Sequence, residues 1–188
     1  MKNIILSFII SALIIPSSVL YSRIVSGIEI PETLKSNSTQ LILNGAGVRE
    51  KFFMDLYVGA LYLKKKDKVA KAIINSKEDM AIRLYITSSL ITSKKMRNAV
   101  NEGFENSTNN NTAPIKKEIG EFTSVFKDEI KDGDIFEMIY TDSLGTSIIK
   151  NGVPSALIKG HRFKEALFGI WLCEEPAQKS LKEDMLGE

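Results

Sequence analysis

Apolar and polar residues alternate with two different periods along this chain, and the difference separates predicted strands from predicted helices. The densest apolar stretch is 53–63, where both alternating sets of positions are apolar. Such a run is typical of a strand inside a sheet that is covered on both faces. With the apolar lead-in before it and a polar break at Glu50-Lys51, it predicts a hairpin over 41–63. Gly45 and Gly47 in its first half would let another segment approach the backbone closely.

Shorter alternating runs predict the remaining strands. A short edge strand ends at Pro31, and Asn151-Gly152 is a strong signal for a hairpin turn. These further predicted strands are 28–31, 80–87, 135–140, 145–150 and 153–158.

Apolar residues at three- and four-residue spacing predict amphipathic helices between and after the strands. The clearest opens at Thr92 or Ser93 and places Met96, Val100 and Phe104 on one face, with Ala99 beside them. The other predicted helices are 69–75 with Asp67 as its cap and Val69, Ala72 and Ile73 on one face, a second amphipathic helix over 115–126, the last main helix over 163–171, and a terminal helix over 178–186. Strands grouped at both ends of the chain predict an α+β domain, an antiparallel sheet covered on one face by helices.

The first residues resemble an export signal rather than part of the fold. A basic start precedes an apolar core of about a dozen residues, which is too short to span a bilayer comfortably. We therefore predict a signal peptide over 1–27, a folded domain over 28–188, and a periplasmic or secreted protein with no stable membrane span after cleavage. The sequence leaves two cleavage sites open, one after Ser22 and one after Gly27. An uncleaved N-terminal anchor is the alternative.

Charge and composition exclude several kinds of chemistry. The formal net charge is +2, and cleavage after Gly27 would remove two basic residues and no acid, so nothing favours nucleic acid as a partner. One histidine, His161, and one cysteine, Cys173, are too few for a metal cluster, and we expect Cys173 to be a small core residue. No phosphate-binding or nucleophile motif is present. We expect no metal, no cofactor and no catalytic residue.

The best chemical candidates are Arg49 and Tyr57, which lie in the two halves of the predicted hairpin. A guanidinium beside a buried strand is costly unless an anion meets it. An arginine and a tyrosine on neighbouring strands could therefore receive an anionic group. A structural role is the alternative, in which Arg49 donates to loop carbonyls and Tyr57 is a core aromatic residue.

The hairpin and a second block also carry a resemblance. The first block is the sequence GAGVR at 45–49 followed by an apolar strand that ends in ALYL at 60–63. The second contains Gly145-Thr146, Asn151-Gly152, Gly160-His161-Arg162-Phe163, the run ALFGIWL at 166–172, Pro176, Ser180-Leu181-Lys182 and Leu186-Gly187. In these two blocks the chain resembles the bacterial branch of the chalcone isomerase-like family, over roughly residues 28–188. The resemblance implies an open-faced β-sandwich, with a ligand cleft between a large sheet and a helical layer.

The resemblance implies two functions for the cleft. In the plant enzyme, which cyclises a chalcone by intramolecular addition, the arginine matches Arg49, but a threonine, a tyrosine and an asparagine fall at Tyr57, Met96 and Gly103. The fatty-acid-binding branch instead uses an arginine and a tyrosine at the positions of Arg49 and Tyr57 to hold a carboxylate. A fatty tail would then lie on Leu61, Met96 and Val100.

The ligand-binding site expected from the resemblance is therefore Arg49, Tyr57, Met96 and Val100. The expected ligand is a small apolar molecule or a carboxylate. Two alternatives remain open, an isomerase of chalcone type and a non-catalytic protein whose pocket is vestigial and whose protein partner is unknown.

Overall fold

Seven strands form one antiparallel sheet in which each strand pairs with its neighbour in the sequence. The computed structural model describes residues 22–36 and 39–188. The strands of this sheet are β3 (Thr33–Ser36), β4 (Thr39–Lys51), β5 (Met54–Leu63), β6 (Met80–Ile86), β7 (Ile135–Thr141), β8 (Gly145–Lys150) and β9 (Val153–Ile158). The strands predicted at 80–87, 135–140, 145–150 and 153–158 and the hairpin at 41–63 are thus confirmed, whereas β3 was not predicted. The hairpin of β4 and β5 holds the two longest strands.

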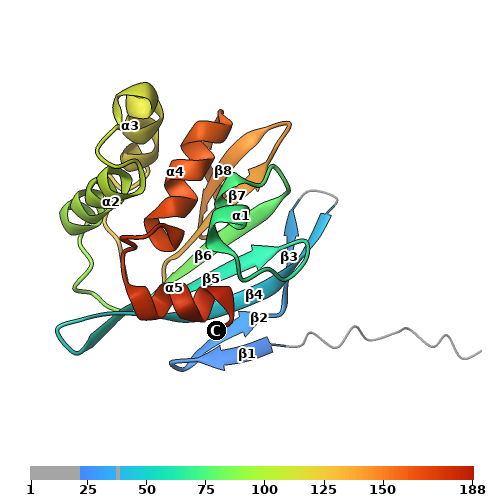
Figure 1. Cartoon of the computed structure of the whole chain (residues 1–188). Helices are drawn as coiled ribbons and strands as arrows, with labels where there is room; N and C mark the ends of the chain where they lie inside the picture. The colour runs from blue at the N-terminus through green and yellow to red at the C-terminus, as the bar shows by residue number, and fades with distance from the viewer. Residues whose placement is uncertain (1–21, 37–38) are drawn as a thin grey trace, which may run out of the picture.

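Helices cover one face of this sheet (Figure 1). They are α1 (Ala70–Asn75), α2 (Ser93–Ser107), a 3-10 turn (Ala113–Ile115), α3 (Lys116–Ser124), α4 (His161–Leu172) and α5 (Lys179–Leu186). α4 lies across the middle of the layer, with α2 and α3 on one side of it and α1 on the other. The apolar side chains of these helices and of the sheet face beneath them form the larger of two cores. The α+β architecture with a helix-covered antiparallel sheet is therefore confirmed.

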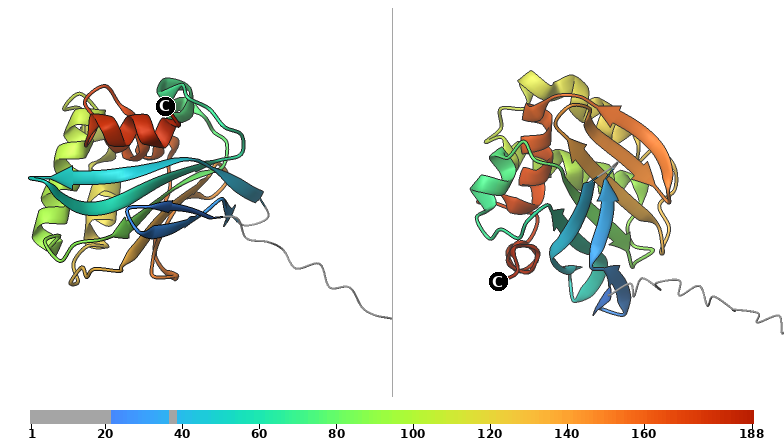
Figure 2. Two further views of the ribbon diagram at one scale, coloured as in Figure 1. Left: turned by 90° about the horizontal axis from the view of Figure 1, so that it is seen from below. Right: turned by 90° about the vertical axis from the view of Figure 1, so that its right-hand side faces the viewer.

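A small two-stranded sheet lies against the opposite face, as the left view of Figure 2 shows. It pairs β1 (Ser22–Val25) with β2 (Ile28–Pro31), so the strand predicted at 28–31 belongs to this sheet and not to the large one. Ile30 of β2 is fully buried against the large sheet, and the hydroxyl of Tyr62 donates to the carbonyl of Pro31 at 3.0 Å. β1 falls within the segment predicted as signal peptide, and residues 1–21 of that prediction lie outside the described residues.

Burial on the two faces of β5 follows the two alternating sets that the sequence shows. Tyr57 and Leu61 belong to the core under the helices, whereas Val58 and Tyr62 belong to the core under the small sheet. The prediction that 53–63 is buried throughout is wrong at its start. Phe53 is fully exposed because it lies in the turn between the strands.

Two helix faces were also predicted imperfectly. On α2 the buried positions are Met96, Val100, Gly103 and Phe104, whereas Ala99 is exposed. On α1 only Ile73 is fully buried, and the other two predicted members of its face, Val69 and Ala72, are exposed. This short helix contacts the core through Ile73, which is buried, and through the partly buried Ala70 and Ile74, and it packs on α4.

Gly45 and Gly47 allow α5 to lie directly on β4. A Cβ atom at Gly45 would lie 2.0 Å from the backbone oxygen of Asp184, and one at Gly47 would lie 2.3 Å from a carboxylate oxygen of Asp184. The pairing of β4 with β5 shifts register at Asn44, between Leu43 and Gly45. The side-chain amide of Asn44 donates to the backbone oxygens of Asp67 and Met185, each at 2.9 Å. The close approach predicted from the two glycines is therefore confirmed, and it positions the N-terminal end of α5 beside the β4–β5 hairpin.

α4 also carries a buried cation that the sequence pattern did not indicate. The side chain of Lys164 is fully buried, and its Nζ donates to the carbonyls of Ile73, Ile74 and Ser76 at 3.0, 2.7 and 2.6 Å. These carbonyls belong to the last turn of α1, where unpaired acceptors and a partial negative charge favour a cation. Lys164 therefore fastens α1 to α4.

Candidate functional site

A cavity of about 480 Å³ opens between the sheet and α2. Most of its wall is apolar and comes from β5, β6, β7, α2, α3 and α4. Its apolar lining residues are Phe52, Met54, Leu56, Leu84, Leu90, Ile91, Met96, Ala99, Val100, Phe122, Phe126, Met138, Ile170, Trp171, Pro176 and Ala177. The residues with polar side chains are Arg49, Lys51, Tyr57, Lys95, Asn98, Glu102 and Asn106.

All four residues predicted as ligand contacts, Arg49, Tyr57, Met96 and Val100, line this cavity. Whether they contact a ligand there stays a prediction. Leu61 does not line the cavity, so its predicted contact with a ligand is wrong. It is fully buried in the core, on the same face of β5 as Tyr57 but four residues further along the strand.

Arg49 and Tyr57 form a directly opposed pair across the β4–β5 ladder. Opposed residues on antiparallel strands project to the same side of the sheet, and their Cβ atoms lie close together. Tyr57 is 9% exposed and Arg49 is half-buried at the cavity mouth. The hairpin therefore delivers one guanidinium and one phenol to the same end of an apolar cavity.

The hydroxyl of Tyr57 is held in place by a second cavity residue. The indole Nε1 of Trp171 donates to the Tyr57 oxygen at 3.0 Å, and both side chains are buried. Burial raises the pKa of Tyr57, although the Trp171 hydrogen bond and the charge of Arg49 act in the opposite direction. The phenol is therefore neutral near pH 7. Because its oxygen accepts from Trp171 and no acceptor for its proton is found among the described residues, the O–H group can donate into the cavity.

Arg49 is held by neutral groups. Its Nη1 donates to the backbone oxygen of Glu50 and to the side-chain oxygen of Gln178, both at 2.8 Å. The Gln178 oxygen also accepts from the Glu50 backbone N–H at 2.9 Å, and the Gln178 amide donates to the carbonyl of Val48. Within residues 22–36 and 39–188 no carboxylate pairs with Arg49.

Arg49 has permanent partners in the protein, including the loop carbonyl that a structural role predicts. None of those partners is anionic, so its charge is not compensated within the described part of the chain. Its Nε and Nη2 groups make no hydrogen bond to these residues and remain able to bind an anion.

Comparison with protein families shows to which family the chain belongs. A family model described as chalcone isomerase-like matches residues 22–187. The chain belongs to the chalcone isomerase-like family. Among solved structures, a fatty-acid binding protein of Arabidopsis thaliana is similar, with a TM-score of 0.71, 19% sequence identity, and coverage of 88% of this chain and 96% of that protein. A search of curated proteins found no match. Membership of the bacterial branch stays a prediction.

For this chalcone isomerase-like chain, the wall contributed by α2 is apolar at the positions that matter for the cyclisation hypothesis. Met96 and Gly103 both line the cavity, and neither can donate a proton or orient a water. Gly103 also allows α2 to lie close to α4, because a Cβ there would be 2.8 Å from Cγ2 of Ile170. The helix thus contributes shape, not acid–base groups, at these two positions.

Two residues of the site were missed by sequence reasoning, Trp171 and Gln178. Trp171 had been assigned only to the packing face of its helix, and Gln178 only to the start of the last helix. They lie 114 and 129 positions along the chain from their partners Tyr57 and Arg49. The sequence offered two hints of these roles. One is the tryptophan, which carries an N–H donor, in the apolar run ALFGIWL, and the other is the polar residue just before the last helix.

Other reactive groups of the described residues do not form a site. No group of three or more His, Cys, Asp or Glu side chains there could hold a metal. Cys173 is half-buried at the end of α4, so its prediction as a core residue is wrong, and burial raises the pKa of its thiol. The His161 ring contacts the Tyr140 hydroxyl through Nδ1 and the Glu165 carboxylate through Nε2. No helix in residues 22–36 and 39–188 has the length and apolar character needed to cross a membrane.

Proposed function

We propose that this protein binds a carboxylic acid with an apolar tail, such as a fatty acid, in the cavity between the sheet and α2. The carboxylate would lie between Arg49 and Tyr57, and the tail would lie against Met96, Val100 and the apolar wall behind them. A fork of guanidinium N–H groups matches the two oxygens of a carboxylate, and the phenol adds a third donor.

One observation carries this proposal. At a single end of an otherwise apolar cavity, an arginine without an anionic partner in the described residues lies opposite a buried tyrosine whose proton is free to donate. Small-molecule sites in proteins have this composition, mostly apolar walls with a few convergent polar groups, and volumes of roughly 300–1,000 Å³. The similarity to a fatty-acid binding protein of the same fold supports the choice of ligand class.

Ligand binding can be followed without a label. Trp171 is the only tryptophan of the chain, lines the cavity and bonds to Tyr57. Titration of the delipidated protein with palmitic acid should therefore change its intrinsic fluorescence in a saturable way. The matching fatty alcohol, which lacks the carboxylate, should bind at least tenfold more weakly.

Variants separate binding at the proposed site from nonspecific uptake of lipid. Arg49→Gln should lower the affinity for palmitic acid by about tenfold or more, because a charge-assisted bidentate pair is lost. Arg162→Gln removes an exposed arginine of α4 that does not line the cavity and should leave the affinity unchanged. Equal affinity in all three proteins would refute the carboxylate site. No fluorescence change with any acid would favour the alternative of a vestigial pocket in a protein that acts through a partner.

We do not propose chalcone cyclisation, because the resemblance places Met96 and Gly103 at positions where the plant enzyme has polar groups. Each missing donor typically contributes on the order of 3 kcal/mol of transition-state stabilisation. We expect naringenin chalcone to cyclise in the presence of the protein at close to its spontaneous rate, as measured by absorbance against a buffer blank. Saturable turnover well above that rate would restore the isomerase hypothesis.

We also propose that the protein is exported, to the periplasm or to the outside of the cell. The support comes from the N-terminal sequence alone, with its basic start and short apolar core. Fractionation of the native cells tests this, with the expectation that the protein leaves the cytoplasm in a form that lacks its first residues.

A further inference from the structure

The turn between β4 and β5 exposes an unusual group of large apolar side chains. Phe52 is 79% exposed, Phe53 is 105% exposed and Met54 is 43% exposed. These three consecutive residues form the end of a hairpin that projects from the body of the molecule beyond α5 (Figure 1). Two adjacent phenylalanines in water are unfavourable, and contiguous exposed apolar groups mark surfaces of interaction.

The backbone of this turn makes the two phenylalanines more unusual. Phe52 and Phe53 have φ angles of +53° and +63°, in the left-handed region. Lys51 pairs with Met54, so these two residues are the whole turn, and positive φ at both is the pattern for which Asn-Gly is strongly preferred. A bulky side chain there opposes local conformational preference. The fold alone therefore gives no reason for an aromatic pair at this position.

The exposed turn adjoins the mouth of the cavity. Lys51, Phe52 and Met54 line the cavity together with Leu90, which precedes α2, and Lys95, which lies in the first turn of α2. Leu90 is itself 40% exposed. Apolar side chains from two separate segments thus surround the same opening.

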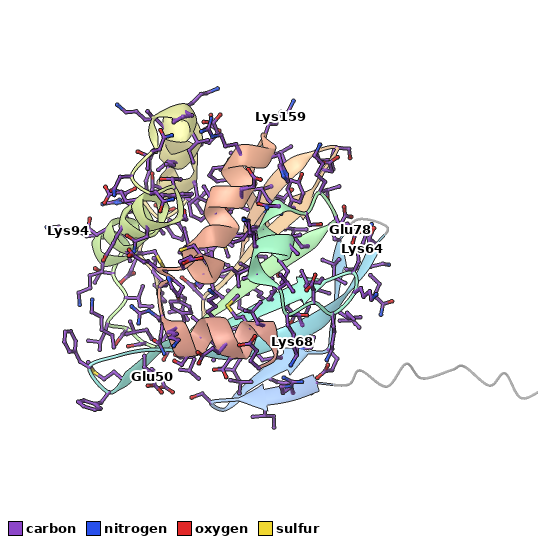
Figure 3. All side chains as sticks on the ribbon, in the orientation of Figure 1. Glu50, Lys64, Lys68, Glu78, Lys94 and Lys159 are labelled. Carbon is purple, nitrogen blue, oxygen red and sulfur yellow. The ribbon has the colours of Figure 1, made fainter. Side chains whose placement is uncertain are left out.

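Basic side chains accompany these apolar groups. The Nζ of Lys51 lies 5.7 Å from the centre of the Phe52 ring, and the Nζ of Lys95 donates to the backbone oxygen of Leu90 at 3.1 Å. Lys94 is exposed beside Lys95, and Figure 3 shows Lys94 and Glu50 on the side of the molecule from which the hairpin projects.

The acidic groups near the opening are Glu50, Asp55 and Glu102. Asp55 accepts a hydrogen bond from Ser26 on the turn of the small sheet, and Glu102 lies further along α2. Lys51 is the charged group in contact with an exposed ring of the turn, while Glu50 and Asp55 pair with each other at the next position of the hairpin. Aromatic rings flanked by lysines are typical of segments that lie in the interface of an anionic bilayer.

We propose that the β4–β5 turn, with Leu90, Lys94 and Lys95, docks on the surface of an anionic lipid bilayer. Phe52 and Phe53 would enter the headgroup region, and the lysines would lie over the lipid phosphates. The mouth of the cavity would then face the bilayer, from which a fatty ligand could enter without crossing water. The docking surface itself does not depend on the proposed carboxylate site.

Vesicle flotation tests this proposal. The purified protein should float with vesicles of phosphatidylcholine and phosphatidylglycerol, and more weakly with vesicles of phosphatidylcholine alone. The double variant Phe52→Asn/Phe53→Gly should lose at least tenfold in apparent affinity for the anionic vesicles, because binding follows the apolar area buried in the interface. Since Asn-Gly suits this turn, the variant should melt at or above the temperature of the unmodified protein, which excludes misfolding as the cause.

Matched variants make the result specific. Val153→Ser/Leu157→Ser removes two exposed apolar residues of β9, 64% and 52% exposed, that do not line the cavity, and should float like the unmodified protein. Arg49→Gln should also float while losing palmitic acid, which separates failure of docking from failure of the binding site. All variants keep the same N-terminal sequence, so any effect of residues 1–21 cancels in the comparison.

The proposal is overturned if the unmodified protein stays unbound to anionic vesicles, or if it floats equally well with both lipid compositions. It is also overturned if the double variant Phe52→Asn/Phe53→Gly floats as well as the unmodified protein. A dimer that is seen by sedimentation velocity, lost in the Asn-Gly variant and accompanied by no flotation, would assign the turn to contact between copies of this chain.

Discussion

Two of the four residues that define the polar end of the site were predicted from the sequence, and the two residues that hold them were not. Arg49 and Tyr57 could be found from the sequence because they lie eight positions apart in one hairpin, where ladder geometry opposes them. Trp171 and Gln178, which hold them, come from the other end of the chain. Each of the two predicted residues therefore has its orientation set by a residue that local pattern could not assign.

The substitution Arg49→Ala should abolish binding of a long-chain acid and change stability little. Glu50 is exposed, so its carbonyl can bond to water, and the Gln178 oxygen still accepts from the Glu50 N–H. We expect a loss of unfolding free energy of about 1 kcal/mol or less. Thermal melts of both proteins with and without palmitic acid provide the measurement. A mutant that melts many degrees lower, beside an unmodified protein that ignores the acid, would favour a purely structural role.

At the scale of elements, contacts between segments explain features that periodicity only suggested. Gly45 and Gly47 are required because α5 lies on β4, and Lys164 is required because α1 ends against α4. The apolar pattern predicted α5 and α4 as helices but contained no information about which segment each would contact.

Gly45→Ala should destabilise the protein strongly. Its new methyl group would lie 2.0 Å from a backbone oxygen of α5, which cannot move without displacing the helix. We expect a loss of about 2 kcal/mol or more, in the range of overpacked cores, together with weaker acid binding because Gln178 moves with α5.

The matched control is Gly120→Ala in α3, where an added Cβ meets nothing within 4 Å. It should raise stability by about 0.5–1 kcal/mol, since alanine favours a helix interior. Urea unfolding of the two variants gives both numbers. Equal stabilities would show that α5 does not lie on β4 in solution.

Lys164 should give the protein a measurable pH dependence. Burial lowers its pKa to about 8 from an ordinary value of 10.5, while the charge of Glu165 acts in the opposite direction. Between these values the unfolded chain binds the proton more than the folded protein does, so unfolding free energy rises with pH.

The comparison protein for this effect is Lys164→Met, in which the carbonyls of Ile73, Ile74 and Ser76 lose the Lys164 donor, although the Ile73 carbonyl still accepts from the Ser76 N–H. It should be less stable by about 2–3 kcal/mol near pH 8, the cost of unpaired buried acceptors. From about pH 8 to about pH 10 the advantage of the unmodified protein over this variant should increase. A constant difference across that range would mean that Lys164 keeps its ordinary pKa.

At the scale of the whole molecule, the small sheet bears on how the chain is processed. β1 pairs with β2, Val25 and Ile28 pack against the second core, and Arg23 lies 3.8 Å from Glu32. Cleavage after Gly27 would remove β1 and uncover apolar surface of that core.

Of the two cleavage sites that the sequence leaves open, we therefore expect the one after Ser22. The intact mass of the protein from its native compartment should correspond to a chain that starts at Arg23. A chain that starts at Ile28 would show that β1 is dispensable, and a soluble cytoplasmic chain that starts at Met1 would contradict export.

The sequence by itself determined the type and order of most elements, although not β1 or β3, together with the two faces of β5, the family, and the Arg49–Tyr57 pair. All of these depend on local period or on neighbours across one turn, which a linear pattern records. Tertiary structure alone decided that Trp171 and Gln178 hold that pair, that Lys164 fastens α1, and that Phe53 is exposed in the β4–β5 turn. These properties arise from contacts between distant segments and from solvent access, and neither is recorded in the alternation of apolar and polar residues.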